Sequence, residues 1–175
     1  MSVSDAVAQW LIEKGITHAF GIVGGGNYAL WDAITRAHKT RIVCCHHEQA
    51  AAMASAYFNR TANRLGSVAL ITTGGGSTNA ITGVAAAWMD RVPLLILSGN
   101  ESSKYLASPG RTKGTQGFDS CALAAPVSKA AARVLVAHMA LPTLDGALAD
   151  AMRPPQGPVW VDIPADIQRH DHVAH

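Results

Sequence analysis

The sequence predicts an α/β fold: a three-layer α/β/α domain with a mainly parallel, doubly wound sheet of about six strands. Segments with apolar residues at helical spacing alternate along the chain with short apolar runs, as in strand–helix–strand units. Two of these runs end in glycine triplets, at 24–26 and 74–76, which permit sharp strand-to-helix turns. A third run, 92–98, is almost continuously apolar, as is typical of a parallel strand covered on both faces.

The chain is expected to begin with a helix. Apolar residues recur there at the spacing of one helix face: Val3, Ala6, Val7, Trp10 and Leu11. Ser2 can cap the start of this helix, and Gly15 can end it in the left-handed conformation that is usual there. Strand–helix units follow in this order: strand 18–23, helix 27–38, strand 41–45, helix 47–63, strand 67–73, a helix ending at 89, and strand 92–98.

The second half of the chain is less regular. Residues 100–125 are polar and rich in Gly, Ser, Thr and Lys, and a loop of this length inside a compact domain is usually either functional or disordered. We favour a functional loop. Residues 127–136 are ambiguous and compatible with a short strand at either end. A helix is expected over 138–152 and a last buried strand over 159–163. We predict a single domain over 1–168, followed by a tail at 169–175 that is a frayed end or the start of a linker.

Composition limits the class of protein. A chain of 175 residues, 49% hydrophobic and 15% charged, can bury one substantial core. Its net charge of +2, without a basic cluster, argues against nucleic acid as a partner. The apolar runs are too short to span a membrane, and no signal peptide is evident. Cys44, Cys45 and Cys121 indicate neither a disulfide framework nor a zinc site, so we expect a reducing, cytoplasmic location.

Glu48 is expected where a strand ends and a helix begins. In open α/β sheets that edge is where ligands bind. A carboxylate in the first turn of a helix can also serve only to compensate the helix dipole. Position alone therefore leaves a binding role and a purely structural role open.

The glycine triplets allow a nucleotide-binding interpretation. Residues 24–29 satisfy the G-x-G-x-x-A pattern, and Glu48 follows at about the distance expected of a ribose-binding acid. A dinucleotide-binding domain of an oxidoreductase usually begins with that strand, however, whereas here a helix precedes it. The second triplet, 74–76, also has no role in this interpretation. A third possibility is that both triplets only allow tight turns.

Several segments, taken together and in order, resemble one known family. They are Gly-Ile-Thr-His-Ala-Phe-Gly at 15–21, His-Glu-Gln at 47–49, Thr-Thr-Gly-Gly-Gly-Ser-Thr-Asn at 72–79, Asp-Arg-Val-Pro-Leu-Leu at 90–95, Gln116, Asp119, Pro-Val-Ser-Lys at 126–129 and Gly-Pro-Val-Trp-Val-Asp-Ile-Pro at 157–164. This pattern is similar to the pyrimidine-binding domain of thiamine diphosphate enzymes, most closely to the acetolactate synthase group. The resemblance covers nearly the whole chain.

The resemblance implies specific roles for site residues. Glu48 would be catalytic: it would hydrogen-bond a ring nitrogen of the cofactor's aminopyrimidine and favour the imino tautomer that removes the thiazolium proton. Gln116 matches a glutamine on the substrate side and is the second catalytic candidate. The cofactor-binding residues would be Val23, Gly24, Gly25, Glu48, Thr73, Gly74 and Asn79. A structural turn role is an alternative for Asn79.

The chain also departs from the family's pattern. Val23 and Gly75 stand where prolines are common, and Gly25 stands where some decarboxylases have a serine. The neighbouring residues His46 and His47 make a poor metal pair, and the histidines at 170, 172 and 175 are interpreted as solvated tail. No metal ligand is predicted in this chain.

The family's diphosphate motifs, a Gly-Asp-Gly triplet and an asparagine pair, do not occur in this sequence. The resemblance therefore implies that a second subunit holds the diphosphate and its Mg²⁺, in a hetero-oligomer with two copies of each chain. The alternative is that the chain is a domain excised from a longer enzyme.

The predicted function is decarboxylation of a 2-oxo acid followed by transfer of the acyl carbanion to an acceptor carbonyl, as in acetolactate synthases. Simple decarboxylases of the family often carry a histidine pair in the segment matching 105–118, and none occurs here, which favours carboligation. The alternatives are a subunit of a sulfopyruvate- or phosphonopyruvate-type decarboxylase, a nucleotide-binding oxidoreductase domain and a non-catalytic scaffold.

Overall fold

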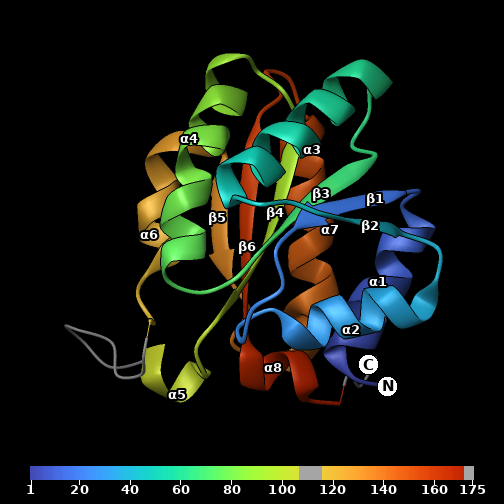
Figure 1. Ribbon diagram of the computed structural model, residues 1–175, viewed down its shortest axis with the longest axis vertical. Coiled ribbons are helices and arrows are strands. Elements are labelled where there is room, and N and C mark those ends of the chain that lie inside the picture. Colours follow the sequence, from blue (N-terminus) through green and yellow to red (C-terminus); the bar gives the residue numbers. More distant parts are fainter. Residues whose placement is uncertain (107–115, 172–175) are drawn as a thin grey trace.

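Six parallel strands form the central layer of the protein, seen here in a computed structural model that describes residues 1–106 and 116–171 (Figure 1). They are β1 (His18–Gly21), β2 (Arg41–Cys44), β3 (Ser67–Ile71), β4 (Leu94–Asn100), β5 (Ala130–Arg133) and β6 (Pro158–Pro164). Their order across the sheet is β2-β1-β3-β4-β6-β5, and every neighbouring pair is parallel. The predicted doubly wound parallel sheet is confirmed.

Helices cover both faces of the sheet and bury a separate apolar cluster on each. On one face lie α3 (Glu48–Ala62), α4 (Gly75–Met89) and the short α6 (Ser120–Ala124). On the other lie α1 (Val3–Glu13), α2 (Tyr28–Ala37), α7 (Ala140–Met152) and α8 (Ala165–Arg169). Within the described ranges, no helix is long and apolar enough to cross a bilayer.

The N-terminal helix forms as its sequence predicts. Ser2 caps α1 by accepting a hydrogen bond from the backbone N–H of Asp5, and the Asp5 carboxylate accepts one in return from the Ser2 N–H. Gly15 follows the helix with φ +70°, in the left-handed region that glycine adopts without strain. Local signals are sufficient here because both ends of the helix are determined by residues next to it, the Ser2–Asp5 capping box at the start and Gly15 at the end.

The structure corrects the predictions for the second half. Two short helices, α5 (Ser103–Leu106) and α6, occupy the ends of the segment expected as a loop, whereas 107–115 lie outside the described residues. Strand β5 lies in the middle of 127–136 and not at either end. A 3-10 turn, Ala125–Val127, ends at the first residue of this segment, and the apolar residues Leu135 and Val136 are about half exposed beyond the strand.

The C-terminal segment is also more structured than predicted. Helix α8 reaches Arg169, and Asp171 forms an isolated antiparallel bridge with Ser2. His170 accepts a hydrogen bond from the backbone N–H of Val3, while the histidines at 172 and 175 lie outside the described residues. The domain boundary after 168 stays a prediction.

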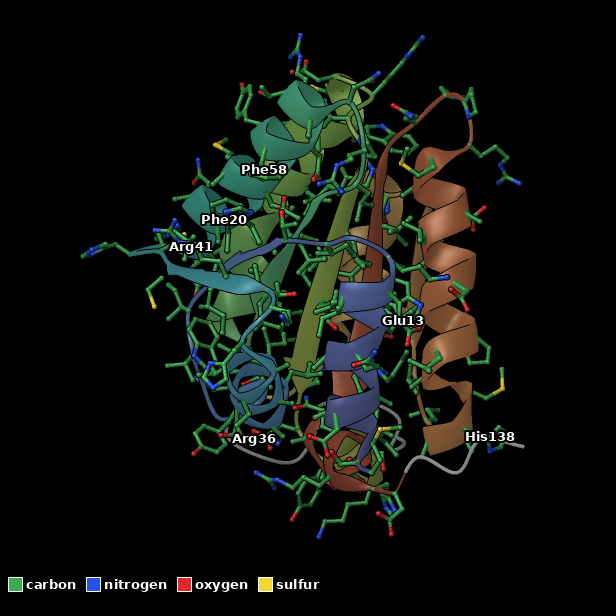
Figure 2. All side chains as sticks on the ribbon, turned by 90° about the vertical axis from the view of Figure 1, so that its right-hand side faces the viewer. Glu13, Phe20, Arg36, Arg41, Phe58 and His138 are labelled. Atoms are coloured by element: carbon green, nitrogen blue, oxygen red, sulfur yellow. The ribbon has the colours of Figure 1, made fainter. Side chains whose placement is uncertain are left out.

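Ring contacts fix α3 against the sheet. Phe58 of α3 lies 4.6 Å from the ring of His18 and 6.1 Å from that of Phe20, both on β1. Phe20 and Phe58 lie near each other in Figure 2, close to Arg41 of the edge strand. Aromatic pairs at such distances stabilise beyond the area they bury. The C-terminal part of α3, the helix that begins with Glu48, is therefore packed against β1.

Helices α3 and α4 approach closely because small residues lie between them. A Cβ atom built on Gly83 of α4 would lie 2.6 Å from the Cβ of Ala52 and 3.1 Å from the carbonyl oxygen of Gln49. Only glycine at this position permits such a distance without displacing one of the two helices. The packing matters for function because α3 and α4 carry the residues of the candidate site.

Gly83→Ala is expected to destabilise the fold by about 1–3 kcal/mol, since the added methyl group overlaps α3. Gly146→Ala is the matched control, because Gly146 lies inside α7 and a Cβ there meets no atom within 4 Å. The control is expected to gain about 0.4–1 kcal/mol by reducing the freedom of the unfolded chain. Urea unfolding of both variants measures the difference, and equal shifts would contradict the close packing of α3 and α4.

The topology places the binding edge of the sheet. The chain leaves β1 for β2 on one side and later enters β3 on the other, so the winding reverses between β1 and β3. Ligands of open α/β sheets bind beyond the carboxyl ends of the strands at such a reversal. The two glycine triplets follow β1 and β3, and Glu48 follows β2.

Candidate active site

Glu48 is the first residue of α3, as the sequence predicts. The preceding His47 caps the helix, with its Nδ1 accepting a hydrogen bond of 3.2 Å from the backbone N–H of Gln49. The Glu48 side chain is buried, with 9% of the residue exposed. A side chain that served only to compensate the helix dipole would be expected in solvent, so its burial favours a more specific role.

Asn79 fixes one oxygen of the Glu48 carboxylate. Its Nδ2 donates a hydrogen bond of 3.0 Å to Oε2 of Glu48. Asn79 lies in the second turn of α4, so the turn role considered for it is wrong. The hydrogen bond joins two helices and holds the carboxylate in one orientation.

Gly76 leaves space beside the other oxygen. A Cβ built on Gly76 would lie 3.3 Å from Oε1 of Glu48 and 3.0 Å from Cγ2 of Thr72. Any larger side chain would cover the carboxylate on this side. Sequence reasoning missed Gly76 as a site residue, although the repeated glycines at 74–76 were a signal that could have identified it.

The turn after β1, residues 24–26, packs against the turn after β3, residues 72–76. These are called the first glycine turn and the third turn, after the strands that they follow. The backbone N–H of Gly26 donates to Oγ1 of Thr72 at 3.2 Å, and a Cβ on Gly24 would lie only 2.5 Å from the same oxygen. Gly24 therefore permits the contact between the two turns. Its own N–H donates to Oδ1 of Asn27 at 2.8 Å. Thr72, which was not among the predicted site residues, links the two turns.

The predicted residues of the third turn come together with Gln116. Gly74 has φ +63°, and a Cβ there would lie 2.6 Å from the Cβ of Gln116. Thr73 is buried, and its methyl group would meet a Cβ on Gly26 at 2.6 Å. Gln116 itself is exposed, and its backbone N–H donates to Glu101 at 3.4 Å.

Two predicted residues lie on the open side of the first turn. A Cβ on Gly25 would meet nothing within 4 Å among the described residues, and Val23 is 49% exposed. Val23 was expected at the end of a strand, but β1 stops at Gly21. The structure thus gathers Glu48, Asn79 and the third turn closely, and leaves the Val23–Gly25 side accessible.

Gly75 provides a local test of the third turn. It is the first residue of α4, and a Cβ there meets no atom within 4 Å in the described part of the chain. Proline fits the first position of a helix, so Gly75→Pro is expected to raise the free energy of unfolding by about 0.4–1 kcal/mol. Gly76→Pro is the control, because the Gly76 N–H donates to the Thr73 carbonyl oxygen at 3.2 Å. Thermal unfolding should show opposite signs, and destabilisation by both would argue against the turn geometry.

Two of the three cysteines, Cys45 and Cys121, are poorly suited to nucleophilic chemistry. Burial raises the pKa of the Cys121 thiol to about 12 and also raises the pKa of Cys45. Both are therefore protonated at neutral pH and are poor nucleophiles. Across residues 1–106 and 116–171, no group of three or more His, Cys, Asp or Glu side chains is placed to hold a metal ion.

Comparison with known proteins identifies one family. The family model described as the thiamine pyrophosphate enzyme N-terminal TPP binding domain matches residues 1–123. This range includes Glu48, Gly76, Asn79 and Gln116.

Individual relatives match along almost all of the chain. The acetolactate synthase large subunit of Haemophilus influenzae is 35% identical over 166 residues, covering 95% of this chain and 28% of the relative. Isozyme 3 of Escherichia coli is 35% identical over 172 residues, with the same coverage, and the large subunit of Buchnera aphidicola subsp. Acyrthosiphon pisum is 32% identical over 177 residues, covering 98% and 29%. The chain thus spans less than a third of the length of these relatives.

Proposed function

This chain belongs to the thiamine pyrophosphate enzymes and forms their N-terminal TPP binding domain, and from that membership we propose that it is the pyrimidine-binding part of an acetolactate synthase-like enzyme. The enzyme decarboxylates a 2-oxo acid and transfers the acyl carbanion to an acceptor carbonyl. Thiamine pyrophosphate, or thiamine diphosphate, is its cofactor.

The arrangement around Glu48 carries this proposal. The carboxylate is buried, Asn79 orients Oε2, and Gly76 keeps a side chain away from Oε1. The residues present therefore fit a flat, nitrogen-containing ring placed against Oε1. When bound, thiamine diphosphate would supply a thiazolium ring, which provides a nucleophilic carbon for carbonyl groups and an electron sink for the carbanion left by decarboxylation.

The residues of this chain have separable roles in the proposal. Glu48 holds and shares a proton with the pyrimidine ring, and Asn79 keeps its carboxylate from rotating away. Thr73, Gly74, Gly24, Gly25 and Val23 line the cofactor side. Gln116, packed against Gly74, lies on the substrate side.

The nucleotide-binding alternative is disfavoured by the first glycine turn. A phosphate bound there would need free backbone N–H groups. The N–H of Gly24 already donates to Asn27, and that of Gly26 donates to Thr72. The sheet also differs from the 3-2-1-4-5-6 order usual for dinucleotide-binding domains, since β1 lies between β2 and β3.

The diphosphate group and Mg²⁺ are proposed to bind to a second half of the enzyme. The acetolactate synthase relatives are more than three times as long as the segment they share with this chain, so they contain room for such a half. We propose that it is a partner subunit, in a hetero-oligomer with two copies of each chain. The alternative arrangement joins both halves in one longer polypeptide.

Product analysis tests the proposed reaction. The chain is combined with a diphosphate-binding half, thiamine diphosphate, Mg²⁺ and pyruvate or another 2-oxo acid, and the products are identified by NMR. Acetohydroxy acids or acyloins are expected. Aldehydes alone would refute carboligation in favour of a simple decarboxylase of the sulfopyruvate or phosphonopyruvate type. Saturable binding of NAD by this chain would refute the thiamine assignment.

A further inference from the structure

Three polar side chains of one short segment, residues 162–168, bond to three separate segments around the candidate active site. The segment runs from the end of β6 into α8 and is called the corner segment below. We propose that Asp162, Asp166 and Gln168 are positioning residues, which fix both described ends of the 101–120 segment that carries Gln116, together with the 24–26 turn. This inference rests on the proposed function, since it concerns how the same site is held.

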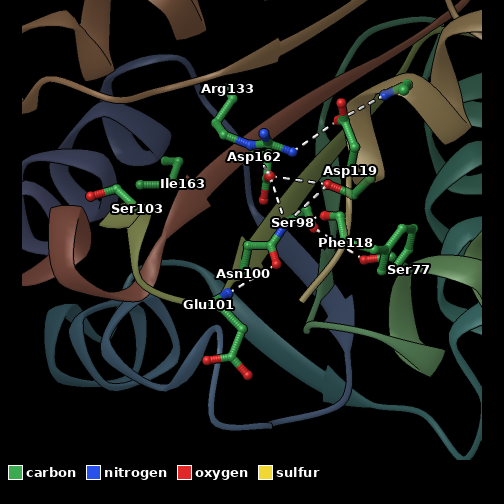
Figure 3. Close-up of polar contacts among 12 residues, drawn as sticks. Ser77, Ser98, Asn100, Glu101, Ser103, Phe118, Asp119, Arg133, Asp162 and Ile163 are labelled. Carbon is green, nitrogen blue, oxygen red and sulfur yellow. Dashed lines mark hydrogen bonds and ion pairs between the residues drawn. The ribbon is translucent and has the colours of Figure 1, made fainter. Parts of the chain in front are cut away.

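Asp162 is the acceptor at the centre of a buried network (Figure 3). The residue is fully buried, and its Oδ2 accepts hydrogen bonds from Nδ2 of Asn100 at 2.9 Å, Oγ of Ser120 at 3.0 Å and Nε of Arg133 at 2.9 Å. These donors come from β4, α6 and β5. One carboxylate oxygen of β6 thus joins the ends of β4 and β5 to the start of α6, where the 101–120 segment ends.

The same donors also hold the neighbours of Ser120. Nδ2 of Asn100 donates to the carbonyl oxygen of Phe118 at 3.2 Å, and Nη2 of Arg133 donates to Oδ1 of Asp119 at 2.9 Å (Figure 3). Residues 118–120 are therefore bonded at each position, two to four residues after Gln116. A shift of this stretch would move Gln116 relative to Gly74.

Burying the Asp162 carboxylate costs desolvation free energy, so stabilisation of the fold alone does not account for this network. Burial raises the pKa of Asp162, although the hydrogen bonds from Asn100 and Arg133 oppose this by favouring the ionised form. Its Oδ1 has no hydrogen-bond partner among the described residues. Buried ion pairs often stabilise no better than apolar residues of the same volume, and their best-attested benefit is a unique geometry. That benefit fits a positioning role.

Asp166 holds the other end of the 101–120 segment. Its Oδ1 accepts from the backbone N–H of Ser103 at 2.9 Å, and its Oδ2 accepts from Oγ of Ser103 at 2.6 Å. Burial raises the pKa of Asp166, but the hydrogen bonds from Ser103, Ser102 and Ile167 together outweigh it and hold the pKa below its usual value. The carboxylate is thus ionised at neutral pH, and both of its oxygens are used to fix the start of α5.

Gln168 holds the first glycine turn. The side chain is buried, and its Nε2 donates to the carbonyl oxygens of Gly26 at 2.6 Å and Ile163 at 2.7 Å. Its Oε1 accepts from the backbone N–H of Leu30 at 3.3 Å. The amide therefore bonds the 24–26 turn through Gly26, the following helix α2 through Leu30, and the corner segment itself through Ile163. The corner segment thereby sets the cofactor side as well as the substrate side.

Asp166→Ala in the complete enzyme tests the inference. The KM for pyruvate is expected to rise about tenfold to a hundredfold, since an error near 1 Å in placing substrate groups has effects of this size. The dissociation constant for thiamine diphosphate is expected to stay unchanged, because Asp166 does not hold the 24–26 turn. Asp166→Asn, which keeps an acceptor for the Ser103 N–H, should recover part of the loss. Asp150→Ala, which removes a carboxylate from the surface of α7, is the matched control.

Amide hydrogen exchange provides a second readout that needs no activity. Asp166→Ala is expected to accelerate exchange over 101–106 and leave α7 unchanged. Unchanged exchange at 101–106, or an equal rise of KM in the Asp150→Ala control, would overturn the inference. If the wild-type enzyme does not turn over 2-oxo acids, the proposed function fails, while the exchange experiment still decides whether the corner segment holds these loops.

Discussion

Glu48→Gln is expected to lower turnover of a 2-oxo acid by about 10²–10⁴-fold, the usual contribution of a positioned acid–base group. Glutamine keeps the volume of the side chain and an oxygen that can accept from Asn79. It cannot give up or take a proton at the position of Oε1. The loss should therefore appear in kcat, with little change in the melting temperature.

The proton step can be measured directly. Exchange of the thiazolium proton of thiamine diphosphate for deuterium, followed by NMR in the assembled enzyme, should slow in Glu48→Gln to the rate of the free cofactor. Glu13→Gln is the control, because Glu13 is an exposed acid at the end of α1 on the opposite face of the sheet. Wild-type exchange rates in Glu48→Gln would show that the carboxylate has only a structural role, as a scaffold module would require.

The position of Glu48 was predictable, but its environment was not. A β-branched run followed by an alanine-rich segment placed it at the start of a helix, which local sequence can determine. Its hydrogen bond to Asn79 joins residues 31 positions apart and depends on how closely α3 and α4 pack. Gly76 and Thr72 were missed for the same reason: each acts through an atom distant in sequence, Oε1 of Glu48 for Gly76 and the backbone N–H of Gly26 for Thr72.

The second half of the chain shows the same limit. Strand β5 has the sequence Ala-Ala-Ala-Arg, which has little strand propensity of its own, and it forms because its backbone pairs with β6. The Asp162 network likewise assembles from β4, α6 and β5, and no spacing in the sequence indicates it. Patterns within one element were readable, whereas contacts between elements required the structure.

Turnover by this chain alone is expected to be undetectable, and addition of a diphosphate-binding half is expected to restore it. The candidate site is open on one side: Val23 is 49% exposed, and a Cβ on Gly25 or Gly75 would meet no atom within 4 Å in the described part of the chain. Ligand sites usually bury about 70–90% of a ligand of this size. A cofactor held here only by its pyrimidine end would bind weakly.

Calorimetry and activity assays measure this dependence. Thiamine diphosphate with Mg²⁺ is titrated into the chain, into a diphosphate-binding half, and into their mixture, and light scattering gives the mass of the complex. Saturable binding is expected only for the mixture, with a mass corresponding to two copies of each chain. Tight binding and turnover by this chain without a second half would contradict the proposed division of the site.

Combining the Glu48→Gln substitution with a titration of the partner half separates an effect on catalysis from an effect on assembly. A variant that only weakens the contact between the halves regains activity when the partner is in excess, because mass action restores the complex. Glu48→Gln is not expected to recover at any partner concentration, since the bond that orients Glu48 and the space beside Oε1 both belong to this chain. Titrating the partner against wild-type and Glu48→Gln chains therefore distinguishes an active-site half from a silent scaffold. In the scaffold case the two curves would reach the same plateau.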